Sequence, residues 1–287
     1  MKIGAMILAF VGRALRAGDP SEGKRLLVET VRNGATAHHI DFVEIDDDCR
    51  WLYPQGFNAD LYRRLKDMAD EIGLEWTIHL PIVGTDPCAP NEFIRRASVD
   101  ATLESIEATR IFQPALYVFH AVCDQAGHDE RSPEPTVRQT WHIQREHAAR
   151  SVEAVLKEVD RERLCIENLP EMAPEHTTAL AREFGTALCF DVGHMLLFGG
   201  DPAQFLDANL AQTREIHLHD VVKDGERLVD HRALGTGIVP VADLVGRFAQ
   251  TDGYLTVEVT GWRAFQRSMT ALEELGFLPP AASAGAA

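Results

Sequence analysis

The sequence predicts a single (β/α)8 barrel, and three observations support this prediction. Short apolar segments alternate with amphipathic segments along the 287 residues, which is typical of parallel strands joined by helices. Eight such units can be counted, which favours a closed barrel over an open sheet. Six of the apolar segments end in a histidine or a carboxylate, namely at His79, His120, Glu167, Asp191, His217 and Glu258. Side chains from six strands can meet only if the strands lie parallel with their tips together, as at the mouth of a barrel.

The expected elements of the first half follow from hydrophobic periodicity. Strands are expected at residues 2–10, 40–45, 75–80 and 115–120. Helices are expected at residues 22–33, 58–73, 91–112 and 136–159. Gly73 suits the C-terminus of the second helix. One face of the third helix is expected to turn toward the core with Ile94, Val99, Leu103, Ile106 and Ile111.

The second half continues the same alternation. Strands are expected at residues 163–168, 187–191, 214–220 and 254–259. Helices are expected near residues 175–184, 202–211, 241–249 and 264–275. Residues 1–278 therefore form one barrel domain, and residues 279–287 form a disordered tail. The polar segment 123–135 contains proline and is expected to be a mobile loop over the barrel mouth.

Composition restricts the classes of partner. A formal net charge of −16 argues against a nucleic acid partner, which normally requires a basic surface, and favours a small-molecule substrate. No apolar stretch approaches the roughly 20 residues that span a bilayer, so no membrane partner is expected. The first residues are followed by no small-residue cleavage site, which indicates a cytoplasmic protein. The sequence does not decide whether the protein forms a homodimer.

The five cysteines are expected to be structural. None of them forms a C-x-x-C pair, and Cys165 and Cys189 lie inside strand-like segments. A reduced cysteine in such a segment behaves as a small apolar side chain.

The side chains at the strand tips have the chemistry of a divalent metal site. Asp191 and His194 form a D-x-x-H pair, and two-residue spacing places His217 and His219 on one side of a strand. Glu167 and Glu258 follow apolar strands, where an unpaired charge is costly, so a cation between them is the natural compensation. The alternative is a pair of buried salt bridges to arginine. The predicted metal ligands are His79, His120, Glu167, Asp191, His194, His217, His231 and Glu258.

The remaining histidines and an acidic run are expected outside the metal site. We expect a solvated surface position for His38, His39, His128, His142, His147 and His176. Glu44, Asp46, Asp47 and Asp48 form an acidic run, which usually is a solvated loop. Glu44 is nevertheless expected to point to the barrel mouth, where it could contact substrate.

Six motifs carry a resemblance to a known superfamily: HLP at 79–81, CIENL at 165–169, CFDVGHM at 189–195, IHLHD at 216–220, DHRALGTG at 230–237 and TVEV at 256–259. Together they resemble the superfamily that joins endonuclease IV with xylose-isomerase-like sugar isomerases and epimerases. The resemblance implies one Mn²⁺, Mg²⁺ or Co²⁺ ion held by Glu167, Asp191, His217 and Glu258. It also implies that the two glutamates move a proton on and off the carbon beside a carbonyl.

Further histidines resemble the hydrolytic branch of this superfamily. Endonuclease IV builds a three-zinc cluster, and its additional ligands resemble His79, His120, His194 and His231. That branch has an aspartate two residues before the last histidine, where this chain has Val229 with Asp230 adjacent. The segments at 114–120, 191–194, 217–234 and 255–272 also resemble cobamide-remodelling phosphodiesterases. DNA is not expected as substrate, because the chain is acidic and lacks basic, aromatic-rich insertions.

Three functional hypotheses follow. The first is a metal-dependent hydrolase of a phosphate ester or phosphodiester in a small metabolite, with zinc or manganese as the expected cation and magnesium or cobalt as alternatives. Substrate would then be positioned by Asn168, His219, Asp220 and Arg232. The alternative is a single-metal sugar or sugar-phosphate isomerase or epimerase that uses Glu167 and Glu258 as acid and base. The third is a non-catalytic binding protein on a barrel scaffold.

Overall fold

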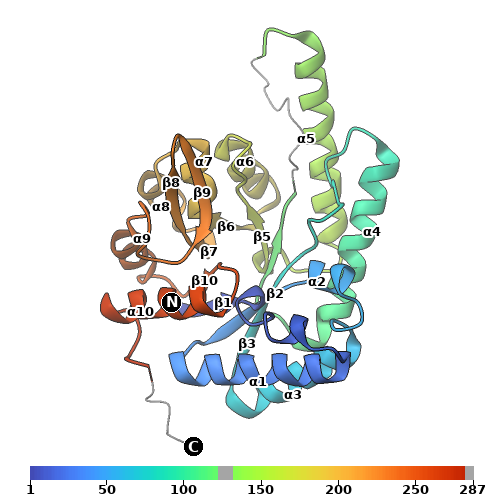
Figure 1. The fold of residues 1–287 in the computed structure, drawn as a ribbon. Helices are drawn as coiled ribbons and strands as arrows, with labels where there is room; N and C mark the ends of the chain where they lie inside the picture. The colour runs from blue at the N-terminus through green and yellow to red at the C-terminus, as the bar shows by residue number, and fades with distance from the viewer. Residues whose placement is uncertain (122–131, 282–287) are drawn as a thin grey trace, which may run out of the picture.

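Eight parallel strands close into a barrel in the computed structural model, which describes residues 1–121 and 132–281. The strands follow one another around the barrel in the order β1-β2-β3-β4-β5-β6-β7-β10, and β10 pairs with β1 (Figure 1). Their bounds are β1 (Lys2–Met6), β2 (Phe42–Asp46), β3 (Glu75–His79), β4 (Tyr117–Phe119), β5 (Leu164–Glu167), β6 (Ala187–Asp191), β7 (Thr213–Leu218) and β10 (Tyr254–Val257). The predicted (β/α)8 barrel is therefore confirmed. The first strand is shorter than predicted, because Ile7–Ala9 form a 3-10 turn, η1.

Helices surround the strands on the outside of the barrel (Figure 1). They are α1 (Pro20–His38), α3 (Ala59–Ile72), α4 (Glu92–Thr109), α5 (Pro135–Val155), α6 (Pro174–Phe184), α8 (Pro202–Asn209), α9 (Val241–Phe248) and α10 (Trp262–Glu274). Several begin at a side-chain cap: Asp19 and Asn58 each accept hydrogen bonds from backbone N–H groups of the first turn. Gly73 ends α3 at a φ of 74°, as its predicted position required.

The predicted apolar face of α4 is only partly correct. Val99 and Ile106 are buried, but Ile94 and Ile111 are 48% and 39% exposed. Ile111 lies beyond the helix in a 3-10 turn, η3 (Arg110–Phe112), where the periodicity of an α-helix no longer applies. Much of the buried face consists of small polar residues such as Thr102, whose hydroxyl donates to the carbonyl of Ser98 in the preceding turn.

Two short α-helices and a two-stranded hairpin were not predicted. They are the helices α2 (Asp48–Leu52) and α7 (Val192–Phe198), and an antiparallel hairpin formed by β8 (Asp220–Asp224) and β9 (Arg227–Arg232). The hairpin stands beside α7 at one side of the barrel (Figure 1). It returns the chain toward the strand tips, and it thereby brings Asp230 and His231 to the cavity described below.

The interior of the barrel is lined by alternate strand residues. Cys165 and Cys189 are buried in a small apolar cluster together with Leu116, Val118 and Ala187. Both thiols are free and act as small core side chains, as the sequence predicts. Among the described residues, no helix is long and apolar enough to cross a lipid bilayer.

Candidate metal centre

A cavity of about 640 Å³ opens at the C-terminal ends of the strands. Six of the eight predicted metal ligands line it: His79, His120, Glu167, His194, His231 and Glu258. The other two, Asp191 and His217, are completely buried at 0% exposure. They sit side by side because Asp191 of β6 is the register partner of His217 in β7. The barrel thus brings together side chains that are up to 179 positions apart in the chain.

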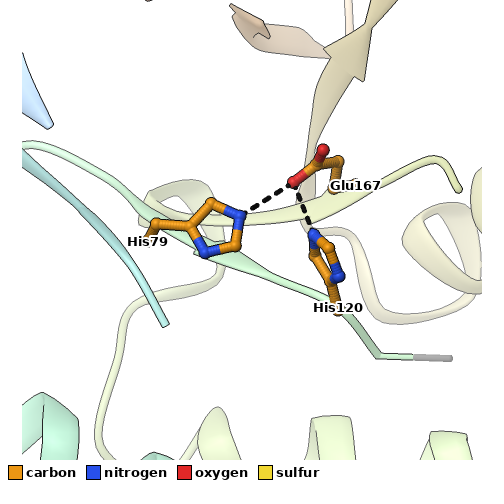
Figure 2. A group of neighbouring side chains, drawn as sticks. All are labelled: His79, His120 and Glu167. Carbon is orange, nitrogen blue, oxygen red and sulfur yellow. Dashed lines mark hydrogen bonds and ion pairs between the residues drawn. The ribbon is translucent and has the colours of Figure 1, made fainter. Parts of the chain in front are cut away.

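Glu167 is the most connected carboxylate of this group. Its Oε2 atom lies 3.2 Å from Nε2 of His79 and 2.9 Å from Nε2 of His120 (Figure 2). Its Oε1 atom lies 3.4 Å from Nδ1 of His217 and 3.5 Å from Nδ1 of His194. Each oxygen therefore faces a different pair of imidazoles, which is the arrangement of a carboxylate that can be shared by two cation positions.

Glu258 contacts a second group of imidazoles in the centre. Its Oε2 atom lies 3.3 Å from Nδ1 of His217 and 3.5 Å from Nδ1 of His219. Its Oε1 atom lies 3.5 Å from Nε2 of His231. The rings of His219 and His231 stack with centroids 4.2 Å apart. His219 was predicted to position substrate, but the structure groups it with His231 and Glu258 as a set of donor atoms.

The donor atoms fit a divalent cation. The buried polar atoms around the centre that have no hydrogen-bond partner within the described part of the chain include Oδ2 of Asp191, Nδ1 of His217, Nδ1 of His219 and Oε2 of Glu258. A buried polar atom without a partner is costly, so their convergence indicates a missing common partner. Imidazole nitrogens and carboxylate oxygens are ligands that Zn²⁺, Mn²⁺ and related cations accept.

Charges within the centre shift the pKa values of its members. Burial alone lowers the pKa of His79, but the hydrogen bond and charge of Glu167 outweigh it and raise the pKa to about 10. Burial is likewise outweighed at His231, where Asp230 and Glu258 raise the pKa to about 11. Burial raises the pKa of Glu167 and of Glu258, yet the charge of His217 and the other imidazoles holds both pKa values well below the ordinary range. Without a cation, protonated His79 and His231 therefore stand beside ionised Glu167 and Glu258.

Two predicted substrate-binding residues hold the backbone in this structure. Asn168 donates from Nδ2 to the carbonyl of Asp191 at 3.0 Å and accepts from the Asp191 N–H at 2.9 Å. Asp220 accepts hydrogen bonds from the backbone N–H groups of Val221, Thr236, Gly237 and Val239. Neither residue lines the cavity, and Arg232 is exposed at the end of β9. Their roles toward substrate stay predictions.

The prediction that Glu44 points to the barrel mouth is wrong. Glu44 lies within β2 and is 0% exposed, and its Oε2 atom is 3.2 Å from Nε2 of His217. Asp46, two residues later, pairs in register with His79 and lines the cavity instead. Burial raises the pKa of Asp46 to about 6.

The rest of the acidic run is not a solvated loop. Asp47 is buried and accepts a hydrogen bond from the Tyr62 hydroxyl. Asp48 is also buried, and it accepts from the backbone N–H groups of Ile82 and Val83. Both carboxylates thus fix the chain next to the strand tips rather than face water.

Two of the histidines expected at the surface are buried. Nδ1 of His38 lies 3.2 Å from Oε1 of Glu273, and Nδ1 of His147 lies 2.6 Å from the carbonyl oxygen of Ala89. His39 and His142 are exposed as predicted, and His176 is half-buried against the Trp141 ring. His128 and residues 123–131 of the predicted loop over the mouth lie outside the described residues, as do residues 282–287 of the predicted tail.

The chain belongs to the xylose isomerase-like TIM barrel family, whose model matches residues 34–280. The resemblance inferred from the motifs is therefore confirmed at the level of the family. No curated protein matches the chain.

Similar solved structures share the fold over nearly their whole length. A D-tagatose 3-epimerase-like protein has a TM-score of 0.72 at 18% identity, with 96% of this chain and 97% of that chain covered. D-Psicose 3-epimerase from Clostridium cellulolyticum H10, determined with D-tagatose, has a TM-score of 0.67 at 14% identity, with 97% and 99% covered. The 3-keto-D-glucoside 4-epimerase YcjR from E. coli has a TM-score of 0.66 at 17% identity, with 96% and 99% covered. Two of these three proteins are sugar epimerases, and the other is described as epimerase-like.

Proposed function

We propose that this protein is a divalent-metal-dependent enzyme that isomerises or epimerises a sugar. The observation that carries the proposal is the placement of two glutamates around one histidine at the cavity floor. Nδ1 of His217 lies 3.4 Å from Glu167 and 3.3 Å from Glu258. The epimerases with the same fold support this proposal over the hydrolase that we first predicted.

Glu167, Asp191, His217 and Glu258 would hold the cation. A divalent cation bound there would polarise a carbonyl or hydroxyl oxygen of the sugar and make the adjacent C–H more acidic.

The two glutamates have the properties of a proton-transfer pair. Both carboxyl groups are ionised at neutral pH, because the surrounding imidazoles hold their pKa values low. Both line the cavity yet are at most 8% exposed, so a bound sugar would exclude water from them. For an isomerisation, the glutamate that accepts the proton from the carbon beside the carbonyl would return it to the neighbouring carbon. For an epimerisation, the other glutamate would first take up a proton from solvent as the sugar binds, and would then donate it to the opposite face of the same carbon.

The lining of the cavity supports a neutral polyhydroxy substrate. Carboxylates and hydroxyls at its rim can bond sugar hydroxyls: Asp46, Thr85, Glu171, Asp230 and Thr260. The described lining residues include no lysine or arginine. A phosphate group would therefore have to rely on bound cations, and we propose an unphosphorylated sugar over a sugar phosphate.

A metal-dependent phosphoesterase is the second candidate, and one observation favours it. Donor atoms exceed the needs of one cation, since His79 and His120 both face Glu167 while His219 and His231 both face Glu258. Additional cations at these positions could bind phosphoryl oxygens and acidify a bound water.

The deciding experiment measures hydrogen exchange and metal content on the same sample. The protein loaded with Mn²⁺ or Co²⁺ is incubated with a panel of free ketoses and aldoses in D2O, and deuterium at carbon is followed by NMR. Exchange is expected, and Glu167→Gln and Glu258→Gln should each reduce it by roughly 10² to 10⁴-fold. Glu175→Gln, an exposed carboxylate on α6, is the matched control and should leave the rate unchanged. Absence of exchange, with more than one metal per chain and hydrolysis of a phosphodiester, would replace the isomerase proposal by the second candidate.

A further inference from the structure

Glu44 lies directly beneath the metal centre, in the interior of the barrel. It is the middle residue of β2, it faces inward, and it is 0% exposed. Neither of its carboxylate oxygens has a hydrogen-bond partner with good geometry among the described residues. Its one ion pair recorded in the structure joins Oε2 to Nε2 of His217 at 3.2 Å. A carboxylate in this position is costly unless it serves the ring that it faces.

His217 therefore presents its two ring nitrogens to two different environments. Nδ1 faces Glu167 and Glu258 on the cavity side, and Nε2 faces Glu44 on the interior side. The ring is 0% exposed, so bulk water does not reach either nitrogen. An imidazole that binds a cation through one nitrogen carries its proton on the other, and a carboxylate that accepts this proton fixes both the tautomer and the ring orientation.

We propose that Glu44 is a positioning residue, which accepts the Nε2 proton of His217 and holds Nδ1 toward the cation side of the centre. This inference rests on the proposed metal site, and it assigns a function to a buried acid that the proton-transfer chemistry does not use. Glu44 has no direct access to substrate, because it does not line the cavity.

The neighbouring Glu215 provides a contrast within the same interior. It is also 0% exposed, but its Oε1 atom accepts hydrogen bonds from Thr256 at 2.8 Å and from Thr77 at 3.2 Å. Glu215 thus has hydrogen-bond partners from the barrel wall, whereas the ion pair of Glu44 is with His217. The donor atoms of Glu44, Glu215 and His217 all lie within 4.8 Å of one another. Replacing Glu215 therefore alters a neighbouring interior carboxyl group for which the described residues show no ion pair with His217.

Metal affinity and stability of the metal-free protein together test this proposal. Glu44→Leu removes the acceptor, and we expect Zn²⁺ affinity, measured by competition with a chelator, to fall by roughly 10 to 100-fold. Glu44→Gln keeps an acceptor oxygen, so its Zn²⁺ affinity should lie between that of Glu44→Leu and that of wild type. Glu215→Gln is the matched control and should bind Zn²⁺ within about threefold of wild type, a margin smaller than the effect of losing a histidine's partner.

The melting temperature of the metal-free protein excludes a merely structural role. Glu44→Leu also removes the ion pair with His217 in the metal-free protein, so the metal-free melting temperature is measured beside the Zn²⁺ affinity, and the affinity should fall by more than the loss of stability accounts for. Equal Zn²⁺ affinity of wild type and Glu44→Leu would overturn the inference while leaving the proposed function intact. Loss of affinity in step with a lower metal-free melting temperature would also overturn it. Wild type that binds no metal would overturn the inference and the proposed function together.

A measurement on the wild-type protein keeps the proposal testable if the variants do not fold. Long-range ¹H–¹⁵N spectra of the Zn²⁺-loaded protein report which ring nitrogen of each histidine carries the proton, and His217→Gln assigns the signals. We expect His217 to be protonated on Nε2, with Nδ1 shifted by the metal. Protonation on Nδ1 would overturn the proposal.

Discussion

At the scale of single residues, the centre is built from imidazoles whose protons compete with a cation. In the metal-free protein, Glu167 raises the pKa of His79 to about 10, and Asp230 and Glu258 raise that of His231 to about 11, in each case against the effect of burial. A cation held by Glu167 and Glu258 repels the protons on His79 and His231, and either histidine must be neutral to bind a metal itself, so entry of the cation favours their release. In the metal-free protein, the protonated histidines therefore compensate the charge of the neighbouring carboxylates.

This competition predicts that metal affinity rises with pH. Between pH 6 and pH 8 both histidines are protonated in the metal-free protein, so each proton displaced strengthens binding by up to about tenfold per pH unit. Titration calorimetry in buffers of different ionisation enthalpy should show proton release on Zn²⁺ binding. An affinity independent of pH, with no proton released, would contradict the ion pairs described here.

The same pKa shifts fix the sign of stability against pH for the metal-free protein. Both histidines have pKa values raised above that of the unfolded chain, near 6.5. Their stabilising contribution is therefore complete below pH 6.5 and is lost as the pH rises through about 10 to 11. The sequence alone suggests none of this, because it depends on distances between strands.

Particular residues show how far the sequence could predict the site. The two-residue period of a strand is enough to place His79, His217 and Glu258 at the inward-facing tips. The same period places Glu44 and Asp46 on the inward side of their strand. It does not show which of the two reaches the rim of the cavity, because that depends on the register with β3. His38 is buried in contact with Glu273, 235 positions away, and no local sequence pattern predicts such a contact.

At the scale of elements, the short helix α7 links the sixth strand to the centre. Asp191 caps it by accepting from the His194 N–H at 2.6 Å, so the strand tip and the first helical turn form one unit. The helix passes so close to β7 that a Cβ added at Gly193 would collide with the His219 ring. A helix of seven residues is too short to show a helical period, which is why the sequence did not predict it.

This close approach predicts the effect of Gly193→Ala. The added methyl group must push the His219 ring away from Asp191 and Glu258, so the free energy of unfolding should fall by roughly 1 to 3 kcal/mol. Metal affinity should fall as well, because His219 loses its place in the donor set. Chemical denaturation and chelator competition measure the two effects.

The matched control is the same substitution in another helix. A Cβ added at Gly246 in α9 meets no atom within 4 Å, so Gly246→Ala should stabilise the protein by roughly 0.5 to 1 kcal/mol through helix propensity alone. If Gly193→Ala proved as harmless as Gly246→Ala, α7 would not pack on His219 as described.

At the scale of the whole molecule, the barrel does not depend on the centre for its fold. All eight strands are paired around a closed ring, and the apolar core extends from the strands to the surrounding helices without using the donor residues. Hydrophobic burial on this scale is sufficient to fold a domain without a metal, in contrast to small metal-dependent domains. The alternation of strands and helices encodes this core locally, which is why the fold class could be predicted from the sequence.

Metal removal should therefore lower stability and leave the fold unchanged. A cation present at about 100 times its dissociation constant adds roughly 2.7 kcal/mol, and in a domain of this size each kcal/mol corresponds to roughly 2 to 4 °C in Tm. We expect a chelator to lower the Tm by roughly 5 to 10 °C, with an unchanged far-ultraviolet circular dichroism spectrum. Adding back Zn²⁺ or Mn²⁺ should restore the Tm. Asp191→Asn, which removes one donor charge and keeps the cap oxygen of α7, should make the Tm insensitive to the chelator. Loss of the helical signal on chelation would instead mean that the cation is part of the folding core.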